Sequence, residues 1–565
     1  MPTRRFALLV GLVGTCVGIA LTYPLVLHPT TTVLDDGTLD AYQFLWNVWW
    51  MRESLVELHT NPFFTRYLYY PQGIGLLFHT LSASLGLATV PLQLVLPGGL
   101  VTAHNVLVVT SPALLVVTTA LLALEVTGDR WAALAAGLLS VVTGAMVWFL
   151  PIIYFTSSYL IAALLWSWWR LHRRRRSGDV VLVLALLAAL VFANQEYAMM
   201  ALALLALDTV ARLVARRRLG FEHLWVRGLV LVWAIAAVGL GALGVVAALN
   251  PAIPPPEPHI VLGSGFLRGF VTPPWLVAPM VPFWAILYLG TAPLCLVVGT
   301  AWFGGRRAVF WAIATAAMLI MACGPFISFT HPMFDGTRGA HDLRHTPVGA
   351  IPGPYLLAMK LHPMLRFFRA PYRWITIAEI AFATLAALGI AGLRARLGPT
   401  SARRIATAVV LVAIVGLGAF DVRYTENTTV ESGVAPDAYA VLRDDPEPSA
   451  VIELPTGITK SHFGNLASRY MFFQTAHRKY LMDGSVARLP RGVVPLVARR
   501  FDDFANLPWV KYVVIHRDLM DAAFPAARTQ VAEVEALLGT QATRVHTDGP
   551  IEIYRLSTFR PESVR

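Results

Sequence analysis

Long apolar runs separated by short polar segments dominate the first 424 residues of the chain. Most of these runs approach the roughly 20 residues that an α-helix needs to cross a bilayer. The pattern therefore predicts a polytopic α-helical membrane protein with about 11–13 membrane helices. The runs lie near residues 6–28, 76–97, 101–124, 131–150, 152–169, 180–195, 197–214, 226–249, 276–303, 308–328, 374–393 and 405–420.

The pattern changes in the C-terminal part of the chain, where short β-type runs replace the long apolar ones. Between them, residues 528–538 have the spacing of an amphipathic helix. We therefore predict two domains. Residues 1–424 form a transmembrane domain whose outer loop 29–75 carries interfacial helices, and residues 425–565 form a soluble extracytoplasmic α/β domain. The β-type runs are 450–454, 510–515 and 551–554.

Composition narrows the class of protein. Apolar residues make up 56% of the chain and the mean hydropathy is +0.61, which excludes a soluble globular protein. The net charge of +12 does not indicate nucleic-acid binding, because the arginines sit in short loops between apolar runs, where positive charge sets membrane orientation. The cysteines have neither disulfide nor metal-ligand spacing; they are Cys16, Cys295 and Cys323.

Four arginine-rich loops determine the expected topology. If all of them face the cytoplasm, residues 76–124 must supply one net crossing, and the break at Leu96-Pro97-Gly98-Gly99 fits a re-entrant or interfacial piece. Residues 6–28 then form an uncleaved first helix with a cytoplasmic N-terminus, because no small-residue cleavage site closes the run. The loop 29–75 and the C-terminal domain are expected outside. The arginine-rich loops contain residues 170–176, 212–218, 306–307 and 394–404.

Three carboxylates, Asp35, Asp36 and Asp40, follow the first apolar run. Acids at a bilayer surface are costly to desolvate and are seldom gathered there without a function. If a helix starts near Asp36, then Asp36, Asp40, Gln43 and Asn47 form one polar stripe beside a tryptophan-rich face. We expect this helix to lie in the membrane interface with its polar stripe toward a cavity. The alternative is a solvated loop whose aspartates cap the helix.

Seven segments together have the pattern of a known family: 36–50, 61–65, 70–73, 352–355, 367–374, 453–455 and 477–484. They resemble the GT-C superfamily of membrane glycosyltransferases, in particular bacterial members and YfhO-like bacterial membrane proteins. The resemblance implies a polyprenyl-phosphate-linked sugar as donor and a glycan, lipid or protein as acceptor, on the outer side of the bacterial cytoplasmic membrane. It also implies that an aspartate of the first outer loop acts at the reacting centre, with Asp36 the first candidate, Asp40 the second and Asp35 the third.

The chemistry of such a transfer explains the charged residues. A carboxylate can take the proton of the acceptor hydroxyl while the lipid phosphate departs. The departing phosphate needs a cation, and Arg369, Arg373 and Arg366, in that order, are our candidates, because the orientation rule does not explain arginines on the outer side. Contact with lipid headgroups is the alternative. The hypothesis requires the early acids and these arginines to converge on one chamber.

Four further residues are candidate substrate contacts: Glu196, His79, Gln43 and Tyr154. Glu196 could instead be a solvated loop tip, and His79 could simply hydrogen-bond a loop. Asp36 and Asp40 could hold Mg²⁺ or Mn²⁺, but no second cluster completes a coordination sphere, so metal dependence stays open and no other cofactor is indicated.

Two alternative functions differ in whether they need the same charges. A transporter or flippase of lipid-linked sugars would guide its substrate with them, but it should show inverted repeats and acids near the bilayer midplane. Here the acids and aromatic residues gather at one expected surface, next to a soluble domain. A non-catalytic scaffold would need neither the acids nor the outer arginines. A glycosyltransferase that binds membrane lipids and no nucleic acid fits the pattern better.

Overall fold

The structure is a computed structural model that describes residues 4–215, 224–249, 260–261, 263–276, 286–330, 343, 346, 349–368, 370–425, 428–457, 465–489, 493, 496, 503–521, 523 and 525–564. By its contacts the chain divides into two compact units. The membrane unit consists of Met1–Tyr23, Val108–Asn250 and Pro254–Asn427. The sheet unit consists of Pro24–Leu107, Pro251–Ile253 and Thr428–Arg565. The acidic loop, assigned above to the transmembrane domain, therefore groups with the C-terminal segment.

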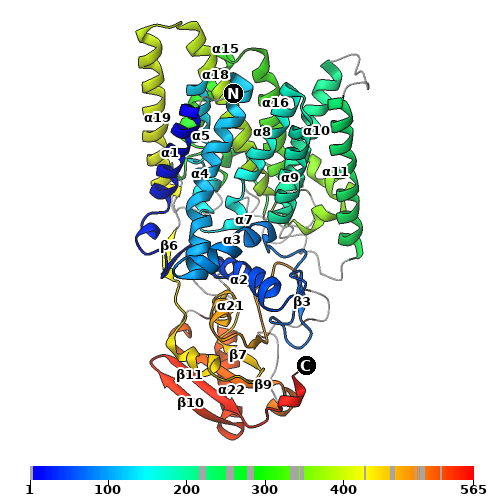
Figure 1. Ribbon diagram of the computed structural model, residues 1–565, viewed down its shortest axis with the longest axis vertical. Coiled ribbons are helices and arrows are strands. Elements are labelled where there is room, and N and C mark those ends of the chain that lie inside the picture. Colours follow the sequence, from blue (N-terminus) through cyan, green and yellow to red (C-terminus); the bar gives the residue numbers. More distant parts are fainter. Residues whose placement is uncertain are drawn as a thin grey trace. The chain divides into compact units, whose positions relative to one another are not determined.

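Helices make up most of the membrane unit (Figure 1). Two-residue strands β4 (Phe326–Ile327) and β5 (Ile351–Pro352) pair antiparallel. The helices are α1 (Arg4–Leu21), α4 (Gly99–Thr127, divided by the unit boundary), α5 (Arg130–Leu139), α6 (Gly144–Trp148), α7 (Ile153–Thr156), α8 (Tyr159–Arg174), α9 (Ser177–Ala193), α10 (Gln195–Ala215), α11 (Leu224–Leu249), α13 (Leu267–Val271), α15 (Thr291–Phe303), α16 (Gly305–Ala322), α17 (Pro354–Leu361), α18 (Ile375–Arg396) and α19 (Ser401–Thr425), with 3-10 turns at Pro363–Phe367 and Pro371–Trp374.

Seven of the described helices are long and apolar enough to cross a membrane. Shorter apolar helices include α9 and α15. The expectation of a polytopic α-helical membrane protein is confirmed. The seven candidate spans are Arg4–Leu21, Gly99–Thr127, Gln195–Ala215, Gly228–Leu249, Gly305–Ala322, Pro371–Arg396 and Ser401–Tyr424.

The apolar runs expected at 131–150 and 152–169 are not two continuous crossings. The first run is divided into α5, of 10 residues, and α6, of 5, and the second into α7, of 4 residues, and α8, of 16. Irregular backbone at membrane depth is tolerated only where protein encloses it. The breaks satisfy this condition, because Val141, Leu150 and Ile152 are all buried.

The described parts of the arginine-rich loops meet at one end of the membrane unit, the upper end in Figure 1, whereas residues 216–218 lie outside the described residues. Ion pairs join Arg173 at the end of α8 to Glu125 near the end of α4, at 2.8 Å, and Arg394 near the end of α18 to Asp129, at 3.0 Å. Arg307 donates to the Val126 carbonyl at 3.1 Å. The predicted clustering of these loops on one side is therefore present in the structure.

The sheet unit is built on a five-stranded sheet of order β10-β11-β9-β7-β8, in which β7 is parallel to β8 and β9 and the other pairs are antiparallel. The expected strands and the expected amphipathic helix, α22, are all present. The bounds are β1 (Thr32–Asp35), α2 (Asp40–Arg52), β2 (Phe64–Thr65), β3 (Ile74–Gly75), α3 (Ala83–Val95), β6 (Thr429–Ser432), α20 (Ala440–Arg443), β7 (Ala450–Leu454), α21 (Leu466–His477), β8 (Tyr480–Leu481), β9 (Val510–His516), α22 (Pro525–Gln541), β10 (Ala542–Asp548) and β11 (Ile551–Leu556).

Side-chain alternation gives the sheet two apolar faces. Ile452 and Val513 lie in a core with Val534 of α22, whereas Val451 and Val514 lie in a second core that contains residues of α21 and α2. Helix α2 is therefore part of the C-terminal core. It is joined to α21 by the indole N–H of Trp46, which donates to Gln474 Oε1 at 2.7 Å.

The tryptophans of α2 correct one expectation. We expected them to place the helix in the membrane interface, but all residues from Ala41 to Met51 are buried. The rings of Trp46 and Trp50 are stacked with their centroids 5.6 Å apart, and each residue is at most 2% exposed. Aromatic residues bury large apolar areas in cores as well as at membrane surfaces. Here they anchor the helix that follows the acidic loop.

Candidate functional site

Asp35 ends strand β1, which pairs antiparallel with β6, so its backbone position is fixed. Its buried carboxylate accepts hydrogen bonds from the backbone N–H groups of Gly37, Leu39 and Ala41, at 2.8, 2.9 and 3.2 Å. The bond from Ala41 satisfies a donor in the first turn of α2 that has no partner within the helix, and the other two bonds hold the turn before it. Desolvation by burial still raises the pKa of Asp35. This aspartate therefore has the capping role that we considered as an alternative.

Asp36 is the next residue and is only 4% exposed. Its Oδ1 accepts from the Thr38 backbone N–H at 3.1 Å and from the Thr38 hydroxyl. Burial, and then repulsion from the neighbouring Asp35, raises the pKa of Asp36 to about 6. A carboxyl group with a pKa near the working pH can both accept and return a proton.

The turn after Asp36 is held in an uncommon backbone conformation. Gly37 has a φ of 80° and Leu39 a φ of 65°, and only glycine adopts positive φ without a steric penalty. Strained non-glycine residues persist where the surrounding structure fixes them and often mark functional sites. The turn directs the chain into α2, whose first residue, Asp40, is half-buried.

Gln43 and His79 form part of a polar network that joins α2 to neighbouring loops. The Gln43 amide donates to the Thr80 hydroxyl at 2.8 Å and accepts from the Ser485 hydroxyl at 2.8 Å. His79 Nδ1 accepts from the Ala487 backbone N–H at 3.2 Å, which leaves the proton on Nε2, 3.1 Å from Asn47 Oδ1. Burial lowers the pKa of His79 to about 3. The polar stripe of α2 thus binds loops, and both ring nitrogens of the neutral histidine are engaged.

Arg373 and Glu196 lie in the membrane unit and pair with each other. Arg373 Nη1 lies 2.8 Å from both carboxylate oxygens of Glu196, and the two side chains are 11% and 7% exposed. The guanidinium also lies over the Phe155 ring, 4.5 Å from its centroid. The charge of Arg373 is therefore balanced, and Glu196 is not a solvated loop tip.

The structure describes two of the three remaining outer candidates, Arg366 and Tyr154. Arg366 lies on the turn Pro363–Phe367, is exposed, and has no ion-pair partner among the described residues. Arg369, our first phosphate candidate, lies outside the described residues. Tyr154 is buried, its ring stacks on Tyr197 at 6.5 Å, and its carbonyl accepts from the Asn194 amide at 3.0 Å.

Two buried polar residues were missed by the sequence reasoning. The Tyr355 side chain is fully buried and interacts electrostatically with Glu196 and Arg373, and its hydroxyl has no hydrogen-bond partner in the described structure. Glu379 lies within α18, 4% exposed, with Oε1 3.4 Å from the Ala145 backbone N–H. The sequence does contain a signal for Glu379, because a carboxylate inside an apolar run is costly to desolvate and is usually functional. Tyr355 had no such signal.

No group of three or more His, Cys, Asp or Glu residues among the described positions could hold a metal ion. The carboxylate of Asp35 is already occupied by three backbone donors. Asp36 and Asp40 alone do not match the six to eight oxygen ligands of calcium or the octahedral shell of magnesium. We therefore derive no step through a metal.

Comparisons with known proteins found similarity in structure alone. No family model and no curated protein matches the chain. The structure is similar to that of the arabinofuranosyltransferase AftD from Mycobacteria, at 14% identity and a TM-score of 0.51, over 99% of this chain and 42% of that one. It is also similar to the oligosaccharyltransferase AglB from Archaeoglobus fulgidus in complex with an inhibitory peptide and a dolichol-phosphate, at 11% identity and a TM-score of 0.43, over 98% of this chain and 74% of that one.

The similarity to AftD concerns the fold. It shows that the chain has the fold of the GT-C membrane glycosyltransferases, as its sequence segments led us to expect. The chain spans less than half the length of AftD. Activity, donor and acceptor do not follow from a fold.

Proposed function

We propose that this protein is a membrane glycosyltransferase that moves a sugar from a polyprenyl-phosphate-linked donor to a hydroxyl group of an acceptor glycan, lipid or protein. The observation that carries the proposal is the buried Asp36 carboxylate, whose pKa is raised to about 6 at the head of a helix anchored in the protein core. The GT-C fold supports the reaction class. Function must still be argued from the site, because one fold hosts many activities.

The proposed step uses Asp36 as a general base. The acceptor hydroxyl oxygen forms a bond to the anomeric carbon while the bond from that carbon to the donor phosphate oxygen breaks. The hydroxyl proton passes to the Asp36 carboxylate, and the lipid phosphate departs as an anion. Burial makes the carboxylate more basic than an exposed aspartate, which improves proton transfer near neutral pH.

The departing phosphate needs cations, and we propose Arg366 and Arg369 for this role. Arg366 is exposed on a short turn and free of carboxylate partners among the described residues. Arg373 is instead proposed as a positioning residue, because Glu196 already balances its charge. The convergence of these arginines with Asp36 on one substrate stays a prediction.

The test is a transfer assay in membranes that contain the full-length protein and radiolabelled polyprenyl phosphates carrying a panel of sugars. We expect the wild type to incorporate label into an acceptor fraction and to release polyprenyl phosphate. Asp36→Asn should lose at least about 100-fold in rate, the lower range for removal of a general base. The exposed Asp437→Asn variant, also in the sheet unit, should retain the wild-type rate.

The same membrane preparation distinguishes a glycosyltransferase from a flippase. A transporter of lipid-linked sugars would move the intact donor across the bilayer without releasing polyprenyl phosphate. Donor translocation without release, or equal release by wild type and Asp36→Asn, would overturn the proposed role of Asp36.

A further inference from the structure

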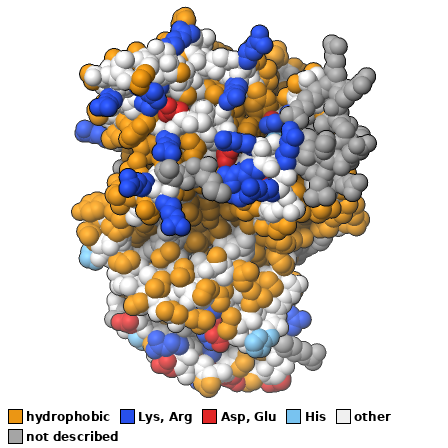
Figure 2. Space-filling view, turned by 45° about the horizontal axis from the view of Figure 1, so that its top comes forward, with side chains coloured by type: hydrophobic (Ala, Val, Ile, Leu, Met, Phe, Trp, Pro, Cys, Tyr) orange, Lys and Arg blue, Asp and Glu red, His pale blue; other side chains and the backbone are white. Residues whose placement is uncertain are grey.

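A second polar centre lies at the arginine-rich end of the membrane unit, far along the chain from the acidic turn. There the structure contains a cavity of about 500 Å³ between the start of α5, the end of α18 and the start of α19. Arg394, Arg403 and Arg404 line it, and no carboxylate residue is among its lining residues. Figure 2, in which the upper end of Figure 1 comes forward, shows many arginine or lysine side chains around this end and few acidic ones.

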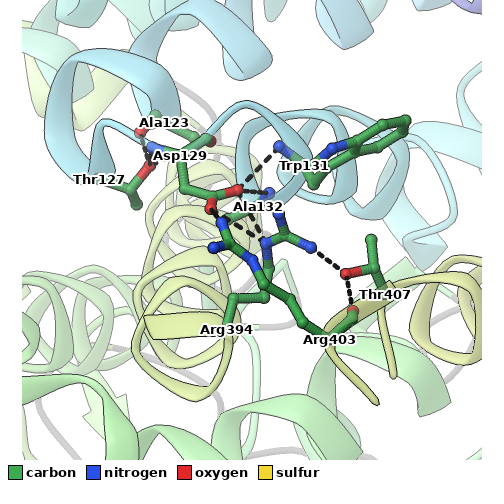
Figure 3. A network of polar contacts seen from close by, with 8 residues as sticks. All are labelled: Ala123, Thr127, Asp129, Trp131, Ala132, Arg394, Arg403 and Thr407. Atoms are coloured by element: carbon green, nitrogen blue, oxygen red, sulfur yellow. Dashed lines mark hydrogen bonds and ion pairs between the residues drawn. The ribbon is translucent and has the colours of Figure 1, made fainter. Parts of the chain in front are cut away.

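A single carboxylate organises the arginines (Figure 3). Asp129 caps α5 by accepting from the backbone N–H groups of Trp131 and Ala132, at 2.9 and 3.0 Å. The same carboxylate pairs with Arg394 Nε at 3.0 Å and lies 3.5 Å from Arg403 Nη2. Asp129 carries one negative charge and therefore balances only one of these two guanidinium groups.

Arg404 adds positive charge that the described structure leaves without a counter-ion. It is exposed, and no described residue forms an ion pair with it. Three guanidinium groups against one carboxylate leave an excess of two positive charges at the cavity. The start of α19, a helix of 25 residues, adds the partial positive charge of a helix N-terminus.

Apart from Thr400 and Thr407, the remaining lining is apolar. Trp131, which is 44% exposed, borders the cavity together with Pro399, Ala408 and Leu411. Tryptophan favours the headgroup level of a bilayer, where one part of its ring is apolar and the other polar. The cavity therefore combines anion-binding groups with an apolar wall, at the ends of two candidate membrane spans, α18 and α19, and of the short apolar helix α5.

We propose that this cavity binds the phosphate headgroup of an anionic phospholipid. Guanidinium groups match phosphate oxygens, and the apolar wall beside them suits the first carbons of acyl chains. Basic pockets between membrane helices recognise anionic headgroups in this way. Free phosphate shares the headgroup chemistry but would gain nothing from the apolar wall. The site is separate from the proposed transfer reaction and does not depend on it.

The experiment measures retention of lipid by the purified full-length protein in non-ionic detergent. Native mass spectrometry counts bound dioleoyl phosphatidylglycerol against bound dioleoyl phosphatidylcholine during titration with each lipid. The test variant is Arg403→Gln/Arg404→Gln, which spares the buried Arg394 and its bonds to Asp129. The matched control is Arg176→Gln/Arg306→Gln, which removes two exposed arginines that do not line the cavity.

We expect phosphatidylglycerol to bind the wild type in preference to phosphatidylcholine. The test variant should bind it about 30-fold more weakly, from the roughly tenfold change per 1.4 kcal/mol and about 1 kcal/mol per arginine near an anionic headgroup. The control variant should change affinity by less than about threefold.

Three results would overturn the proposal. Equal binding of the two lipids would remove the preference for anions. Equal losses in the test and control variants would point to general surface charge. Displacement of the lipid by millimolar inorganic phosphate, with the same affinity for phosphate alone, would show a free-phosphate site. Thermal unfolding of both variants checks that each still folds.

Discussion

Replacing Asp36 by asparagine should make the protein more stable at neutral pH while it removes transfer activity. The folded state holds the Asp36 proton more tightly than the unfolded chain, because burial and Asp35 raise its pKa from 3.8 to about 6. The ionised side chain therefore opposes folding. Asparagine has nearly the same shape, keeps an oxygen that can accept from Thr38, and carries no charge.

The size of the effect follows from the pKa difference. About two pKa units at 1.36 kcal/mol each correspond to roughly 3 kcal/mol of destabilisation above pH 6. Since the new amide N–H₂ group also needs partners, a gain of about 1–3 kcal/mol is expected. For a unit of this size that gain raises the unfolding midpoint by roughly 2–10 °C.

The dependence on pH distinguishes this explanation from a general effect of the substitution. A raised carboxyl pKa favours the folded state most below pH 4, and this contribution is lost as the pH rises through 6. The difference between Asp36→Asn and wild type should therefore be full at pH 7.5 and nearly absent at pH 4. Thermal unfolding of the purified protein in detergent at several pH values measures it, with the exposed Asp437→Asn variant as control. A pH-independent difference, or a less stable Asp36→Asn at pH 7.5, would refute the reasoning.

Three further predictions concern other parts of the chain. Glu196→Gln leaves Arg373 buried and unpaired and should lower the stability by about 3–5 kcal/mol, whereas Glu196→Gln/Arg373→Gln should recover much of the loss in thermal unfolding; additive losses would contradict the pairing. His79→Ala leaves two hydrogen-bond partners unsatisfied and should cost about 1–3 kcal/mol without changing the donor KM; a raised KM at unchanged stability would restore its predicted substrate contact. Val430→Cys, on a background without the three native cysteines, should react with a membrane-impermeant thiol reagent added outside intact cells; labelling only after lysis would contradict the predicted topology.

Much of the fold was predictable from local patterns. Apolar runs of membrane length identified helices such as α4, α10 and α18, because a bilayer fixes the length that such a helix must have. Period-two and helical spacing identified β7, β9 and α22 in the C-terminal domain. The arginine loops were grouped correctly at one end of the membrane unit, since charge and helix parity constrain them together.

The errors arose where tertiary packing decides. Trp46 and Trp50 have the same local signal in a membrane interface and in a core, and only the contact with Gln474 shows which applies. The pairing of Glu196 with Arg373 joins residues 177 positions apart and leaves no periodic trace in the sequence. The three aspartates were ranked only from the family resemblance, and the sequence could not show that three backbone N–H groups occupy the Asp35 carboxylate.

The rate of polyprenyl phosphate release, measured against pH in membranes containing the wild-type protein, tests the role of Asp36 most directly. If the ionised Asp36 accepts the acceptor proton, the rate should fall about tenfold for each pH unit below about 6, where this carboxylate becomes protonated. A rate that stays constant from pH 4.5 to 7.5, or release that persists in Asp36→Asn, would contradict the account.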